Sequence, residues 1–89
     1  MKAIVTVIGK DRIGIIAQVS NILAKNMVNI LDISQTILQE NFTMIMLVDL
    51  SKMKISFSEL SKKLDEKGKT LGLQIKVQRD EIFKAMHQV

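Results

Sequence analysis

The residue types best suited to binding chemistry lie in one short segment, Gly9-Lys10-Asp11-Arg12-Ile13-Gly14-Ile15. The segment follows an apolar, β-branched run and precedes an amphipathic one, so it is expected to turn from a strand into a helix. The first amides of a helix have no partner within the helix, and they suit an anion. We therefore predict a turn that senses a small molecule rather than one that catalyses a reaction.

Each residue of this turn also has an ordinary structural role. Gly9 would let the chain leave the strand in a conformation that other residues avoid. Asp11 can cap the helix, and Arg12 can simply be solvated. Gly14 lies in the first helical turn, where glycine costs about 0.5–1 kcal/mol against alanine. We therefore expect either a ligand or the neighbouring strand to approach the Gly14 backbone closely.

Strands and helices at regular spacing are expected to position this turn. Apolar alternation predicts strands over 2–8, 29–39, 42–50 and 71–78, and periodicity with capping signals predicts helices over 12–26, 56–68 and 80–89. The first and third strands are apolar on both faces, which places them centrally, and the others have one polar face. A two-residue break at 40–41 joins the second and third strands in a hairpin.

This order predicts an α+β fold, the ferredoxin-like βαββαβ sandwich. It has a four-stranded antiparallel sheet with two helices on one face, plus a short C-terminal helix. We expect one domain over 1–89, with a core at 2–79 and a helical extension at 80–89. The first helix is expected to end at Asn26 in the left-handed conformation and the second at Gly68. Apolar spacing predicts the buried face of the first helix as Ile13, Ile16, Ala17, Ser20, Leu23, Ala24 and Met27.

Composition narrows the classes of function. The 89 residues hold no cysteine, which excludes disulfides, thiolate metal sites and a cysteine nucleophile. His87 is the single histidine, so no metal site, cofactor or catalytic triad is expected. The formal charge is +4, but the lysines alternate with acidic residues, which predicts a solvated surface rather than a nucleic-acid site. With no signal peptide or membrane-spanning run, we expect a cytoplasmic protein.

The two helices can cover one face of the sheet, and the central strands still carry apolar side chains on the other. Such a patch usually marks a contact surface. We expect a second copy to cover it, which makes the protein a homo-oligomer such as a homodimer. The alternative is a monomer whose own final helix covers the face.

At the turn the sequence resembles the ACT domain, a small ligand-sensing module. The family pattern Gly-x-Asp-Arg-x-Gly-Ile/Leu is matched by Gly9, Asp11, Arg12, Gly14 and Ile15. A second family feature, Asn-Ile at the start of the second strand, stands here as Asn29-Ile30. The resemblance covers residues 2 to about 79 and is closest to the stand-alone ACT proteins of bacteria and archaea. The chain departs from the family at Met27, where a glycine is usual.

The resemblance implies regulatory binding of a small molecule, most often an amino acid, between this turn and a neighbouring domain. Backbone amides of Ile13 to Ile16 would receive the ligand carboxylate, Asp11 would receive its ammonium group, and Asn29 would bridge to it. The regulated partner would be a second copy or another protein. The expected ligand-binding residues are Gly9, Asp11, Arg12, Ile13, Gly14, Ile15 and Asn29, with no catalytic residue.

Two rival functions fit parts of the same pattern. An acylphosphatase-like enzyme on this fold would hold phosphate with Arg12 and position water with Asn29, although Asp11 would repel the phosphate. A single-stranded RNA binder would need aromatic residues on the central strands. The chain offers three aromatic residues, Phe42, Phe57 and Phe83, and the first strand has none. A pure dimerisation module is the third alternative to the sensor.

Overall fold

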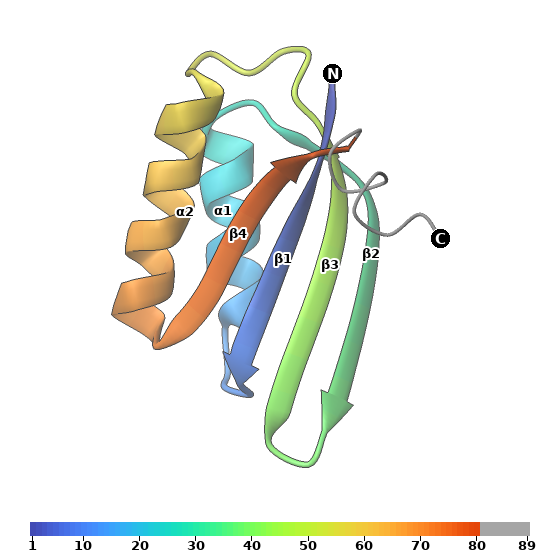
Figure 1. Cartoon of the computed structure of the whole chain (residues 1–89), viewed down its shortest axis with the longest axis vertical. Helices are drawn as coiled ribbons and strands as arrows, with labels where there is room; N and C mark the ends of the chain where they lie inside the picture. Colours follow the sequence, from blue (N-terminus) through green and yellow to red (C-terminus); the bar gives the residue numbers. More distant parts are fainter. Residues whose placement is uncertain (81–89) are drawn as a thin grey trace.

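The computed structural model of the chain describes residues 1–80. Its elements follow in the order β1 (Lys2–Lys10), α1 (Ile15–Lys25), β2 (Asn29–Leu38), β3 (Asn41–Asp49), α2 (Phe57–Leu71) and β4 (Leu73–Arg79). This confirms the predicted ferredoxin-like βαββαβ order (Figure 1). Of the helix predicted over 80–89, residues 81–89, with Phe83 and His87, lie outside the described residues.

The four strands form one antiparallel sheet in the order β2-β3-β1-β4. The predicted central position of β1 and β3 is therefore confirmed. Both helices lie on one side of this sheet: in Figure 1, α1 passes behind β4 and α2 lies beside β4. Neither of these two helices, which are those of residues 1–80, lies behind β2. The described helices include none that is long and apolar enough to cross a membrane.

The core lies between the two helices and the sheet. Alternate residues of β1, β3 and β4 point toward the helices and are buried, as expected for strands with one covered face. The largest fully buried side chains contribute roughly 1.5–3 kcal/mol each through burial. They are Leu23, Met44, Met46, Leu60, Leu64, Val5, Val7, Val19 and Val48.

Helix α1 begins three residues later than predicted, and its buried face is different. Gly14 has a left-handed backbone with φ of 89°, so the chain becomes helical at Ile15 rather than near Arg12. Because Ile13 precedes the helix, it does not share the helical spacing, and its side chain is 99% exposed. The buried residues are Ile15, Val19 and Leu23, spaced four apart. Leu23 is the member of the predicted face that this set retains.

The left-handed residue after α1 is Met27 rather than Asn26. Asn26 has φ of −101°, whereas Met27 has φ of 62°. Met27 therefore adopts a left-handed conformation that favours glycine, at a cost in backbone strain. The Asn26 side chain donates from Nδ2 to the carbonyl oxygen of Ile22 at 2.8 Å, which satisfies one of the last carbonyls of the helix.

Helix α2 continues through Gly68 and ends at Leu71, which corrects the predicted end. Gly72 follows with φ of 73° and caps the helix in the left-handed conformation. Gly68 is needed for close packing instead, since a Cβ there would lie 2.7 Å from the Leu73 carbonyl oxygen. A helix and an edge strand thus meet backbone to backbone at this point.

The hairpin between β2 and β3 turns at residues 39–40, one position before the predicted break. Gln39, with φ of 58°, supplies the positive φ that such a tight turn needs. In β2, every residue except the half-buried Ile30 is exposed. This strand therefore presents an open edge and, on the side of the helices, an uncovered surface.

Candidate functional site

Two hydrogen bonds hold the turn between β1 and α1. The backbone N–H of Asp11 donates to the carbonyl oxygen of Glu40 at 2.7 Å, which ties the turn to the β2–β3 hairpin. Arg12 Nη1 donates to the carbonyl oxygen of Leu71 at 2.8 Å, at the C-terminus of α2. Figure 1 shows the turn and the hairpin at the same end of the sheet. Arg12 thus has an intramolecular role that its sequence position did not reveal.

The two glycines of the turn have exchanged the roles predicted for them. A Cβ on Gly9 would lie 2.4 Å from Leu73 Cδ2 and 3.3 Å from its Cα, so Gly9 permits the close approach of β4. A Cβ on Gly14 would meet nothing nearer than Gln18 Nε2, at 3.8 Å. Gly14 is needed for its φ of 89°, a conformation that other residues rarely adopt.

The start of α1 is uncapped among the described residues. No side chain accepts a hydrogen bond from its first amides, so the predicted Asp11 cap is wrong. The first bond within the helix runs from the Gln18 N–H to the Gly14 carbonyl oxygen at 3.0 Å. In α2, by contrast, Ser56 Oγ accepts from the Glu59 N–H at 3.1 Å. The chain therefore caps one helix start and leaves the other open.

A groove with a volume of about 460 Å³ lies beside this open helix start. One wall comes from the turn and the first turn of α1, and the other comes from β2 and β3. No ion pair or hydrogen bond engages the Asp11 carboxylate within residues 1–80. The lining residues are Asp11, Arg12, Gly14, Ile15, Ile16, Ala17, Gln35, Ile37 and Phe42.

Most of the predicted site residues meet at this groove, but Asn29 does not. The groove is lined by four of them: Asp11, Arg12, Gly14 and Ile15. Gly9 does not line it but precedes these residues and packs closely against Leu73 of β4. Asn29 pairs with Asp49, which pairs with the first residue of β1. At roughly 3.3 Å per residue, Asn29 lies about 26 Å from the turn.

The positions of these residues test the acylphosphatase-like pair and the expected role of Ile13. Within one chain, Arg12 and Asn29 lie at opposite ends of the sheet, so the acylphosphatase-like pair is not assembled. The exposed Ile13 side chain does not line the groove. Sequence reasoning missed Gln35 and Ile37, which face the helix side of β2. The alternation along their strand could be recognised in the sequence. That neither described helix covers this part of β2 could not be predicted from it.

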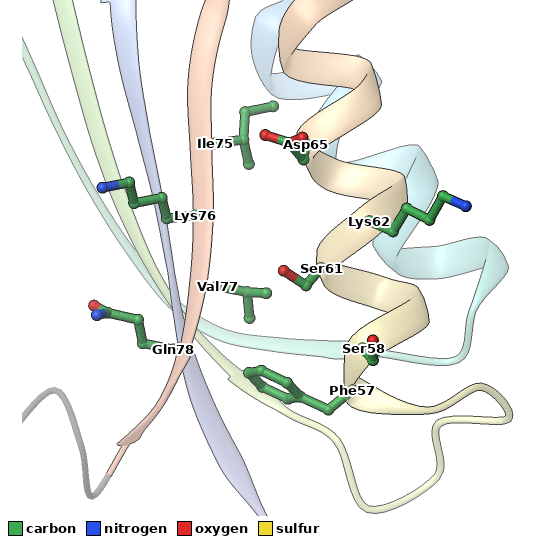
Figure 2. Close-up of a pocket in the computed structure, with 9 residues that line it drawn as sticks. All are labelled: Phe57, Ser58, Ser61, Lys62, Asp65, Ile75, Lys76, Val77 and Gln78. Carbon is green, nitrogen blue, oxygen red and sulfur yellow. The ribbon is translucent and has the colours of Figure 1, made fainter.

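A larger hollow of about 640 Å³ lies between α2 and β4. Figure 2 shows Ile75 and Val77 pointing from β4 toward the helix, whereas Lys76 and Gln78 point away. Asp65 on the helix wall is 3.4 Å from Lys69 Nζ, so its charge is already paired. The helix start beside this hollow is the capped one, which makes the smaller groove the better anion site.

The chain thus combines the ferredoxin-like fold with a groove beside an uncapped helix start. The chain belongs to the ACT domain family, whose sequence model matches residues 2–78. The family consists of regulatory modules that bind small molecules, often amino acids, rather than of catalytic domains.

Known relatives agree with this assignment over the whole chain. A UPF0237 protein of Clostridium acetobutylicum is 63% identical over 89 residues, which is 100% of both chains. The solved ACT domain protein from Streptococcus pneumoniae is 47% identical, with a TM-score of 0.82 and 98% of each chain covered. The regulatory subunit of aspartate kinase from Thermus thermophilus shares the fold at 23% identity. Its TM-score is 0.67, and the match covers 89% of this chain and 51% of that one.

Proposed function

We propose that this chain is a regulatory module that binds an amino acid in the groove beside the start of α1. The observation that carries the proposal is the uncapped helix start next to the Asp11 carboxylate, which has no partner within residues 1–80. The first amides of α1 would receive the ligand carboxylate, and Asp11 would receive its ammonium group. A groove of about 460 Å³ falls within the range of small-molecule sites.

The turn also offers a route from ligand binding to a response. Arg12 lines the groove and, at the same time, bonds to the carbonyl oxygen of Leu71. The guanidinium has five donors, so a carboxylate in the groove would bond to donors that the Leu71 carbonyl leaves open. Ligand binding would thus change how firmly Arg12 holds the C-terminal end of α2. It would thereby shift the protein between states that bind the ligand unequally.

A second copy is the partner that we propose for this module, with a regulated protein as a further one. Apolar side chains stay exposed on the sheet face opposite the helices, including Ile8 (48%) and Ile45 (38%). Size-exclusion chromatography with light scattering should give a dimer or larger assembly, and Ile45→Glu should shift it toward monomer. A wild-type monomer at high concentration would refute this part of the proposal.

Thermal denaturation in the presence of each amino acid tests the binding proposal. A ligand at about a hundred times its Kd adds about 2.7 kcal/mol to the free energy of unfolding. For a domain of this size, that raises the midpoint by about 10 °C or more. The matching amino acid amide, which lacks the carboxylate, should give no shift.

Two variants with the same charge change complete the test. Asp11→Asn should abolish the shift, whereas Glu66→Gln, on the exposed surface of α2, should leave it unchanged. The proposal fails if no amino acid stabilises the wild type. It also fails if Asp11→Asn and Glu66→Gln respond alike.

A further inference from the structure

The groove has a polar half and an apolar half, and the apolar half comes from β2 and β3 together with Ile16 of α1. On β2, residues that pair with buried β3 residues face the helices: Gln35 pairs with Met44, and Ile37 pairs with Phe42. Ile37 stays 53% exposed, since neither helix within residues 1–80 covers this part of β2. An apolar surface is therefore held open directly across from the helix start.

The two halves of the groove would contact different parts of one ligand. The polar half comprises Asp11, Arg12 and the first amides of α1. The apolar half comprises Ile37, Phe42 and the exposed Ile16 side chain, with Gln35 as its single polar member. A small molecule with a charged head on the first half would place its side chain on the second.

We propose that the ligand is an amino acid with an aliphatic side chain and that Ile37 is the residue that selects it. This inference rests on the function proposed above. A polar side chain on this surface would lose its hydration and find few partners, whereas an aliphatic one gains from burial. Burying two or more additional methylene groups should favour the aliphatic ligand by about tenfold or more.

The same surface could instead be covered by a second copy of the chain, without any selection. In that case the side chain of a bound amino acid would not contact Ile37, and changing this residue would not alter which amino acids bind. Selectivity therefore separates a ligand contact from a subunit contact.

Calorimetric titration of the full chain with leucine, isoleucine, valine, serine, aspartate and lysine tests the inference. Wild type should bind at least one aliphatic amino acid about tenfold or more tightly than serine or aspartate. Ile37→Thr, which keeps a β-branched residue on an exposed strand, should reduce that preference to about threefold or less. Leu31→Thr, elsewhere on β2 and outside the groove, should leave it unchanged.

The outcomes distinguish this inference from the function on which it rests. If polar and aliphatic amino acids bind equally, the groove binds amino acids but its apolar half does not select them, and the inference is overturned. A preference that survives Ile37→Thr, or that Leu31→Thr weakens equally, overturns the role of Ile37. If no amino acid binds, the proposed function and the inference fail together.

Discussion

Arg12→Ala should destabilise the protein even when no ligand is present. The structure gives Arg12 one long-range hydrogen bond, from Nη1 to the carbonyl oxygen of Leu71 at 2.8 Å. A bond to a charged group contributes about 1.5–3 kcal/mol, and a cation at a helix C-terminus adds about 0.3–1 kcal/mol. Because the Arg12 side chain is exposed and screened by solvent, we expect less than the sum of the two contributions, about 1–2 kcal/mol.

For a domain of this size, that loss lowers the midpoint of thermal unfolding by about 4–15 °C. Lys10→Ala is the matched control, since it removes the same charge from an exposed residue of the same turn and should change stability by about 0.5 kcal/mol or less. Arg12→Lys should fall between the two. If Arg12→Ala and Lys10→Ala unfold at the same temperature, the bond to Leu71 contributes nothing, and Arg12 is free for another purpose.

Three further changes test other parts of the fold. Met27→Gly should stabilise the protein by up to about 1 kcal/mol in urea denaturation, because glycine adopts the positive φ without strain; a loss would mean that the Met27 side chain contributes more than the strain costs. Gly68→Ala should destabilise it despite the better helix propensity of alanine, since the added Cβ would lie 2.7 Å from the Leu73 carbonyl oxygen; a gain would show that the helix moves freely. The Ser51 N–H donates to the Asp49 carboxylate, and this hydrogen bond lowers the pKa of Asp49. The ionised Asp49 should therefore stabilise the folded state above about pH 4, and this contribution should be lost as the pH falls further. Asp49→Asn should remove that acid-sensitive component, and an unchanged pH profile would count against it.

The fold was largely predictable because several independent signals agreed. Apolar alternation on both faces of β1 and β3 placed these strands centrally, and the element order led to the same arrangement. The residue at which α1 begins, and therefore the set of residues that faces the core, could not be predicted from these signals. It depends on the left-handed Gly14, which delays the helix to Ile15 and turns a different set of residues toward the core. Hydrophobic spacing cannot reveal where a helix starts when no side chain caps it.

The part of the site that is contiguous in sequence was predicted, whereas contacts between residues far apart in the sequence were not. The turn residues are adjacent in sequence, so their meeting required no knowledge of the fold. The roles of Gly9 and Arg12 depend on contacts with Leu73 and Leu71, far along the chain, which sequence spacing does not show. Ile37 belongs to the groove because neither helix of the described chain covers this part of β2, which is a property of the whole architecture.

Amide chemical shifts during an amino acid titration test the central claim most directly. The account predicts that the largest changes in a ¹⁵N–¹H spectrum fall on Ile15, Ile16 and Ala17, since a bound carboxylate would accept hydrogen bonds from their N–H groups. Changes centred instead on Ser58 and Ser61 of the α2–β4 hollow, or no change with any amino acid, would contradict it.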